Sequence, residues 1–125
     1  MTTPTATTPQ TLDRIHRELP GYQAAISGPL DEDRFEVHGI PGHDLAPLAP
    51  TLRALALQWS VLYDGLGGAY DFGSNDEVLI SASRGFVLLR VDHPRRRYLA
   101  VQISSSGNVG YLRFRMRQWL KELAR

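Results

Sequence analysis

The sequence predicts one α+β domain in which helices cover both faces of an antiparallel sheet. The first indication is the order of its patterns. Helical and strand-like segments follow one another as α-β-β-α-β-β-β-α, and short turns join neighbouring strands. The second is the segment 85–92, where Phe86 and Leu88 alternate with Val87 and Leu89. Because both faces of this strand are apolar, each side of the sheet needs a covering layer.

The N-terminal part predicts a tail, a short helix and a hairpin. Residues 1–10, MTTPTATTPQ, are small, polar and interrupted by proline, which predicts a disordered tail before a domain at 11–125. A helix is expected at 9–19, since proline suits the first helical position and Pro20-Gly21 ends the pattern. Two strands follow, at 22–28 and 34–40, and the polar face of the second is typical of a sheet edge.

A long helix is predicted over 45–66, regular from about Pro50, and it carries apolar residues on two sides. One stripe is suited to the sheet and consists of Leu45, Leu48, Leu52, Leu55, Trp59, Leu62 and Leu66. The opposite stripe consists of Ala54, Leu57 and Val61. The second stripe needs its own cover, either another helix of this chain or the same helix of a second subunit.

Three further strands, at 77–82, 85–92 and 98–104, lead into a terminal helix. Asn108 is placed to cap that helix, and its apolar stripe comprises Val109, Leu112, Met116, Trp119, Leu120 and Leu123. Tyr111 and Phe114 lie roughly opposite this stripe. They either pack against the first helix or remain free for a partner.

Charge and composition exclude several classes of protein. The chain has no cysteine, so disulfide frameworks, thiolate catalysis and cysteine zinc sites are excluded. It has no apolar run near 18 residues and no basic-then-apolar start, which favours a cytoplasmic protein without a membrane span. The net charge of +1 hides an acidic part up to Asp76 and a basic part after it, and in one compact domain most of this asymmetry is expected to cancel.

No motif in the sequence indicates catalysis or a cofactor. The glycines at 65–68 lack the lysine and the strand-to-helix setting of a phosphate loop. His38 and His43 flank a Pro-Gly turn with a spacing that suits a metal, but exposed turn histidines are the favoured interpretation, and no metal is expected. The other two histidines, His16 and His93, are expected to face solvent.

A basic hairpin tip is formed by Arg95, Arg96 and Arg97. Such a cluster could contact phosphates. Nucleic-acid binding is nevertheless not expected, because the aromatic residues near these arginines, such as Tyr98, are not arranged on a strand face as stacking platforms for bases.

The order and spacing of these elements resemble the Roadblock family, which includes dynein light chains and bacterial MglB-like proteins. The resemblance covers about residues 11–124. It is strongest at Gly107-Asn108-Val109-Gly110, similar to the family's opening of the last helix, and at LPGYQAAI (19–26), similar to its first strand. The sequence PLDEDR replaces the Asp-Gly turn that the family often has between its first two strands.

The resemblance implies a five-stranded antiparallel sheet, with the long helix on one face and the other two helices on the other. It also implies a homodimer in which the long helix packs against its mate and the third strand extends the sheet across the two-fold axis. The expected interface residues are therefore Ala54, Leu57, Val61, Val78, Leu79 and Ile80.

For function, the resemblance implies a non-enzymatic regulator or adaptor of a small Ras-like GTPase. The alternative is a structural assembly module without a GTPase partner. Candidate partner contacts are Arg95, Arg96, Arg97, Tyr111 and Phe114.

Overall fold

The structure is a computed structural model, and it describes residues 7–67 and 77–123. It has the α+β architecture expected from the sequence, with one additional 3-10 turn, η1. The elements are α1 (Thr7–Glu18), β1 (Tyr22–Pro29), β2 (Glu36–Gly39), η1 (Ala46–Leu48), α2 (Ala49–Gly67), β3 (Glu77–Ala82), β4 (Gly85–Asp92), β5 (Arg97–Ser104) and α3 (Val109–Leu123).

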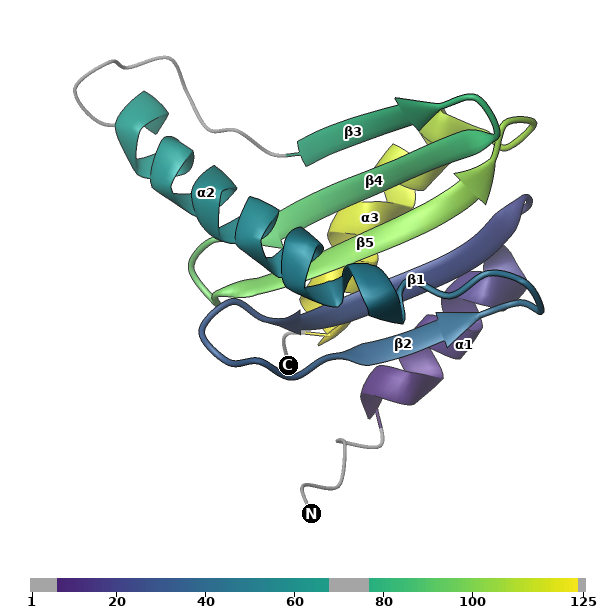
Figure 1. Cartoon of the computed structure of the whole chain (residues 1–125), viewed down its shortest axis with the longest axis horizontal. Helices are drawn as coiled ribbons and strands as arrows, with labels where there is room; N and C mark the ends of the chain where they lie inside the picture. The colour runs from purple at the N-terminus through teal and green to yellow at the C-terminus, as the bar shows by residue number, and fades with distance from the viewer. Residues whose placement is uncertain (1–6, 68–76, 124–125) are drawn as a thin grey trace.

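The five strands form one antiparallel sheet in the order β2-β1-β5-β4-β3 (Figure 1). The last strand therefore inserts between β1 and β4, where Ala100 pairs with Ile26 on one side and Leu89 on the other. This arrangement leaves β2 and β3 as the two edges of the sheet.

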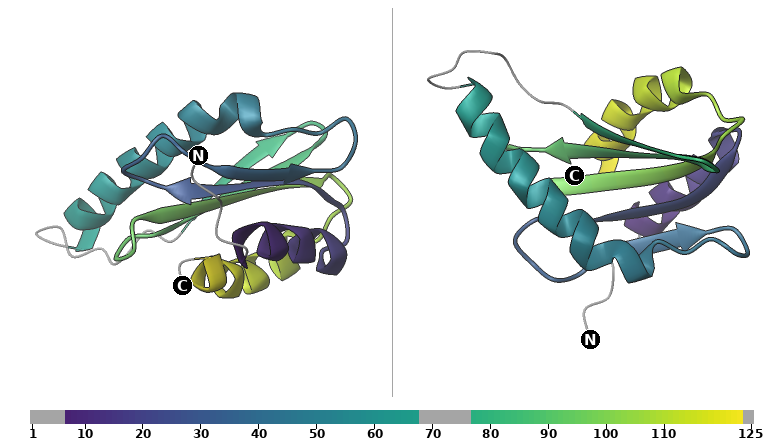
Figure 2. Two further views of the ribbon diagram at one scale, coloured as in Figure 1. Left: turned by 90° about the horizontal axis from the view of Figure 1, so that it is seen from below. Right: turned by 45° about the horizontal axis from the view of Figure 1, so that its top comes forward.

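Helices cover both faces of the sheet, as the two apolar faces of β4 and the family resemblance both imply. Helix α2 crosses one face, whereas α1 and α3 lie side by side on the other (Figure 2). Residues that alternate along the strands divide between two cores: Leu88 and Val101 face α1 and α3, and Leu89 and Ala100 face α2. The largest fully buried side chain, Trp119, belongs to the core under α1 and α3.

The predicted sheet-facing stripe of α2 is partly wrong. The buried side of α2 is made by Ala49, Leu52 and Ala56, and Leu45 before η1 is buried with them. Leu48 at the end of η1 and Leu62 on α2 are exposed. The small alanines let the helix approach the sheet closely, and so the buried line is rotated away from the line of leucines. One flank of α2 is left apolar and uncovered.

The helix ends agree closely with the sequence signals. Asn108 caps α3 as predicted, because its Oδ1 accepts a hydrogen bond of 3.0 Å from the Tyr111 N–H. Helix α1 begins at Thr7, two residues before the predicted start, so residues 7–10 of the predicted tail are helical. The rest of that tail, 1–6, lies outside the described residues, and so does Gly68 after the end of α2.

Candidate interaction surface

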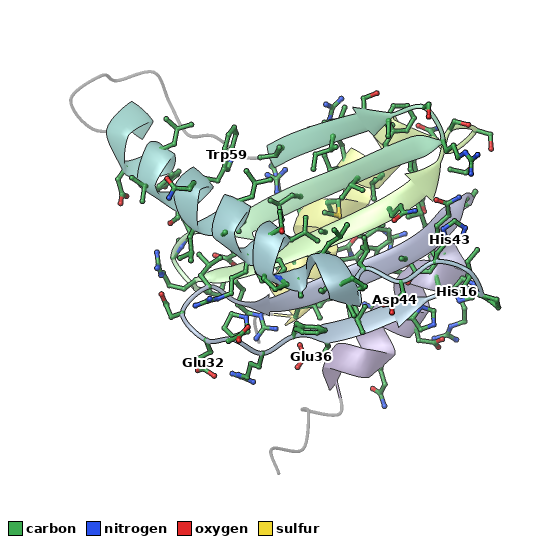
Figure 3. The ribbon with its side chains drawn as sticks, viewed as in Figure 1. His16, Glu32, Glu36, His43, Asp44 and Trp59 are labelled. Carbon is green, nitrogen blue, oxygen red and sulfur yellow. The ribbon has the colours of Figure 1, made fainter. Side chains whose placement is uncertain are left out.

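The uncovered flank of α2 carries a line of apolar side chains, which we call the α2 ridge: Leu48, Leu55, Trp59 and Leu62. Leu48 and Leu62 are 48% and 41% exposed. Leu55 and Trp59 are half-buried, because one side of each packs against the core under α2. Leu55, Trp59 and Leu62 follow one another at steps of four and three residues, so they lie along one side of α2. Leu48 precedes them at the end of η1. Trp59 lies on the flank of α2 that faces β3 (Figure 3).

The sheet is also incompletely covered on the α2 face near β3. A groove of about 330 Å³ opens there, and Ile80, Ala82 and Val87 form its apolar part. Gln23 and Gln102 lie at its polar end, where the Gln102 amide donates a hydrogen bond of 2.9 Å to Gln23. Together the α2 ridge and this groove give one face of the molecule an apolar surface suited to a protein partner.

The edge strand β3 borders this surface. It pairs with β4 on one side only, from Glu77 opposite Arg90 to Ala82 opposite Gly85. Of the residues predicted at the interface, Val78 is half-buried, whereas Leu79 and Ile80 are 37% and 39% exposed. Three consecutive apolar residues on an open edge are a template for pairing with another strand.

The other predicted interface residues, on α2, do not lie on the ridge. Ala54 and Val61 are exposed on the side of the helix away from the sheet, and Val61 is 67% exposed. Leu57 is half-buried and packs against the core under α2. The helix therefore presents two apolar surfaces, the α2 ridge and the pair Ala54 and Val61.

The three consecutive arginines at the hairpin tip have different environments. Arg95 is exposed and pairs with Asp92 of the same turn at 3.2 Å. Arg96 has a positive φ of 56° and binds Asp31 through two nitrogens, at 2.7 and 3.0 Å. Arg97 is mostly buried beside Glu36 at 3.8 Å. Arg95 is thus the one of the three that points most freely to a partner.

These pairs connect the acidic and basic parts of the chain. The hydrogen bond and charge of Arg96 hold the pKa of Asp31 below its ordinary value, against a smaller opposing effect of desolvation. Because such pairs join distant parts of the sequence, the charge asymmetry cancels locally, as expected for one compact domain.

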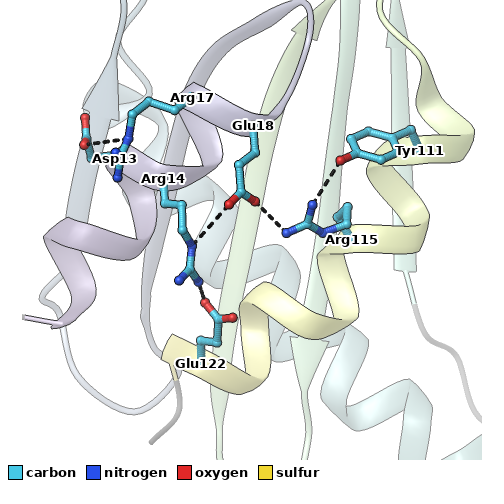
Figure 4. A network of polar contacts seen from close by, with 7 residues as sticks. All are labelled: Asp13, Arg14, Arg17, Glu18, Tyr111, Arg115 and Glu122. Atoms are coloured by element: carbon cyan, nitrogen blue, oxygen red, sulfur yellow. Dashed lines mark hydrogen bonds and ion pairs between the residues drawn. The ribbon is translucent and has the colours of Figure 1, made fainter.

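A polar network joins α1 to α3 and includes Tyr111 (Figure 4). Arg115 donates to the Tyr111 hydroxyl at 3.0 Å and pairs with Glu18 of α1 at 2.5 Å. Arg14 of α1 bonds Glu122 of α3. Tyr111 is half-buried by these contacts and by the core beneath it, which favours the first of its two alternatives, packing within the chain.

Phe114, in contrast, is 76% exposed, the largest value among the exposed large hydrophobic residues in the described ranges. It borders a hollow of about 480 Å³ that is also lined by Arg113, Arg117 and Glu77. An apolar ring surrounded by arginines suits a binding surface, since aromatic and arginine side chains contribute most to protein interfaces.

The histidines are placed differently from the sequence interpretation. His38 and His43 do not face one another: His38 bonds the Tyr22 hydroxyl at 2.7 Å, whereas His43 lies beside Gln102 at 3.4 Å. His93 does not simply face solvent, because it stacks on Tyr63 with ring centroids 3.9 Å apart. No local pattern signals these contacts, because the residues involved are at least 16 positions apart.

No protein-family model and no curated protein matches this sequence at a significant level. Solved structures do match its fold. The Roadblock/LC7 domain from Streptomyces avermitilis superposes with a TM-score of 0.69 at 17% identity, over 91% of this chain and 92% of that one. The gliding protein MglB from Thermus thermophilus has a TM-score of 0.74 at 16% identity, over 100% and 93% of the two chains. An MglB with a tetrameric arrangement gives 0.75 at 16% identity with the same coverage.

These matches show that the chain has the Roadblock fold, in agreement with the resemblance in its sequence. Within the described ranges, none of the helices is both long and apolar enough to cross a bilayer.

Proposed function

We propose that the chain forms a homodimer that regulates or scaffolds a small Ras-like GTPase without contributing a catalytic residue. The observation that carries this proposal is the apolar surface formed by the α2 ridge and the open edge of β3, in a fold of the Roadblock type. The tetrameric arrangement of one matched MglB supports self-association of this fold.

The dimer uses two features of this surface. Two copies of β3 pair along their free edges, and Ile80 and Leu62 become buried between the subunits. Each buried leucine or isoleucine side chain is worth roughly 1.5 to 3 kcal/mol when fully removed from water, and less here because each is already partly covered. The two-fold axis doubles each contact, because the same patch is used on both subunits.

Substitutions at two neighbouring residues of α2 distinguish which of its two apolar surfaces forms the dimer interface. We expect Leu62→Asp to produce a monomer in light scattering and sedimentation, because it places a charge in the α2 ridge. Val61→Asp is the matched control and should remain dimeric. A monomeric Val61→Asp with a dimeric Leu62→Asp would instead select the Ala54, Leu57 and Val61 stripe predicted from the sequence. A wild-type chain that is monomeric in the same measurements would overturn the dimer.

The GTPase contact is assigned to Phe114 and the arginines beside it. Phe114 supplies an apolar anchor, and Arg117 supplies charge that accelerates encounter with an acidic surface. Arg113 also lines the hollow, but its charge is paired with Glu77. Arg95 adds to this charge from the hairpin tip, whereas Arg96 and Arg97 mainly hold the fold together.

The decisive experiment is titration against each small GTPase of the source organism, in GDP and GTP-analogue states, with hydrolysis followed in parallel. We expect one of them to bind, and Phe114→Ser to weaken its binding at least about tenfold. Phe35→Ser is the control, since Phe35 is also exposed but lies next to β2. If no GTPase binds, the structural assembly module is the better description. Nucleotide turnover by this chain alone would contradict the absence of a catalytic residue.

A further inference from the structure

Side chains from two elements that are distant in sequence meet between α1 and β2. Asp13 and His16 are three residues apart on α1 and therefore share one face of the helix. His38 comes from β2, the edge strand beside α1 (Figure 1). One potential ligand atom from each of the three lies within 4.8 Å of the others.

The Tyr22 hydroxyl makes two contacts with His38, and together they indicate which nitrogen of the ring carries the hydrogen. Tyr22 is a buried residue, and its hydroxyl group has one hydrogen to donate. The hydroxyl donates to the His38 carbonyl oxygen at 3.0 Å. Its oxygen lies 2.7 Å from His38 Nδ1. When the hydroxyl gives its one hydrogen to the carbonyl oxygen, Nδ1 is the donor in this second contact, and this is the tautomer on which the proposal is built.

In this tautomer the Nε2 atom of His38 has a free lone pair, and it faces the carboxylate of Asp13. Asp13 Oδ1 lies 3.9 Å from Nε2, with no hydrogen on either atom when the imidazole is neutral. The other carboxylate oxygen of Asp13 is already paired with Arg17 at 3.3 Å. The His16 ring completes the group, stacked on Tyr22 at 4.9 Å and 5.1 Å from the His38 ring. Two acceptors that face one another at this distance are suited to a cation between them.

We propose that Asp13, His16 and His38 bind one divalent transition-metal ion of the zinc type. Two imidazole nitrogens and one carboxylate oxygen are a common ligand set for Zn²⁺, with water in the fourth position, and they are poorly suited to Mg²⁺ or Ca²⁺. Ligand distances of about 2.0 to 2.2 Å require the three groups to move closer together. Asp13 is exposed, so its side chain rotates at little cost. The bound ion connects α1 to the β2 edge.

In the proposed site Tyr22 does not bind the metal ion itself, but it contacts His38, which does. Such groups orient a ligating histidine and set its tautomer, and their removal typically lowers metal affinity by about 10- to 100-fold. Tyr22→Phe keeps the buried ring and removes only the hydroxyl. It therefore separates this role from the packing of Tyr22.

Calorimetric titration of the full, tag-free chain with ZnCl₂ tests the proposal. We expect one ion per chain, and at least about a tenfold loss of affinity in Asp13→Asn and in His16→Gln. His43→Gln is the matched control, because His43 is a partly buried histidine outside the cluster, and it should bind as the wild type does. Absence of binding, or binding unchanged in both ligand variants, would overturn the proposal.

Nitrogen NMR of the histidine rings gives a second measurement that does not depend on stability. Before zinc is added, His38 should be the Nδ1–H tautomer, and on addition its Nε2 resonance should shift. In Tyr22→Phe the tautomer preference should relax and the affinity should fall at least about tenfold. An Nε2–H tautomer in the zinc-free wild type, or a zinc shift at His43 in place of His38, would show that the site is not the one described.

Discussion

The two edges of the sheet, β2 and β3, are protected in different ways. Strand β2 has four residues, alternates apolar and polar side chains, and is joined to other elements by Glu36 and His38. Strand β3 has six residues, contains Val78, Leu79 and Ile80 in succession, and has no proline or lysine. Short length, charge and covering elements are the usual protection of an edge strand against pairing. The difference supports the proposal that the chain associates through the β3 edge, while the β2 edge stays closed.

A matched pair of substitutions, one on each edge strand, tests this difference most directly. Ile80 on β3 and Val37 on β2 are both 39% exposed, and both point to the α2 face of the sheet. Ile80→Lys should weaken self-association by about 100-fold or more, because it buries an unpaired charge at a symmetric interface. Val37→Lys should leave the association unchanged. Sedimentation of both variants over a concentration series measures the two dissociation constants.

The result is interpretable only if both variants remain folded. Circular dichroism and thermal unfolding provide that control, and both substitutions are on the surface of the described chain. Equal weakening by the two lysines would contradict the assignment of β3 as the associating edge. Weakening by Val37→Lys alone would assign association to β2.

The closed edge is expected to depend on a mostly buried ion pair. Glu36 and Arg97 are 16% and 17% exposed in their side chains, with 3.8 Å between the charged atoms. Glu36→Gln leaves the Arg97 charge without its partner, which should lower the free energy of unfolding by about 1 to 2 kcal/mol. Urea denaturation at neutral pH measures the loss. No loss of stability would mean that the pair does not secure β2.

Much of this edge comparison could be predicted from the sequence, because alternation of polar and apolar residues is a local signal. The run at 77–82 and the mixed face at 34–40 already distinguish the two strands. The side of α2 that faces the sheet could not be predicted in the same way. Its spiral carries apolar residues around most of its surface, so the small side chains of Ala49 and Ala56 decide which line faces the sheet.

The candidate metal ligands could not be found in the sequence for a different reason. His16 and His38 are 22 positions apart and belong to a helix and a strand whose contact depends on the whole fold. The sequence instead suggests His38 with His43, which are neighbours in a turn. In the structure the strand turns His38 toward α1, and the turn after it places His43 beside Gln102.

The other edge strand, β3, is held to α3 by a more exposed ion pair, which is expected to contribute less. Glu77 at the start of β3 bonds Arg113 of α3 at 2.5 Å and lies 3.8 Å from Arg90. Arg113 is about half exposed, so the pair is worth roughly 0.2 to 1 kcal/mol. Glu77→Gln should therefore increase amide hydrogen exchange in β3 several-fold, with little effect on β1 and β5. Increased exchange spread evenly over all strands would contradict a local role for Glu77.

The smallest expected effect is the pH dependence of the pair between Asp31 and Arg96. These residues connect the turn before β2 to the turn between β4 and β5. Arg96 holds the pKa of Asp31 below its ordinary value in the folded chain. A lowered folded-state pKa stabilises the protein above the unfolded value, about 3.9, and this contribution is lost as pH falls through the folded value. Asp31→Asn should therefore be slightly less stable than the wild type at pH 7, and the difference should disappear in acid. Urea denaturation of both proteins across the acid range measures it, and a difference that grows as pH falls would show that Asp31 is not stabilised by Arg96.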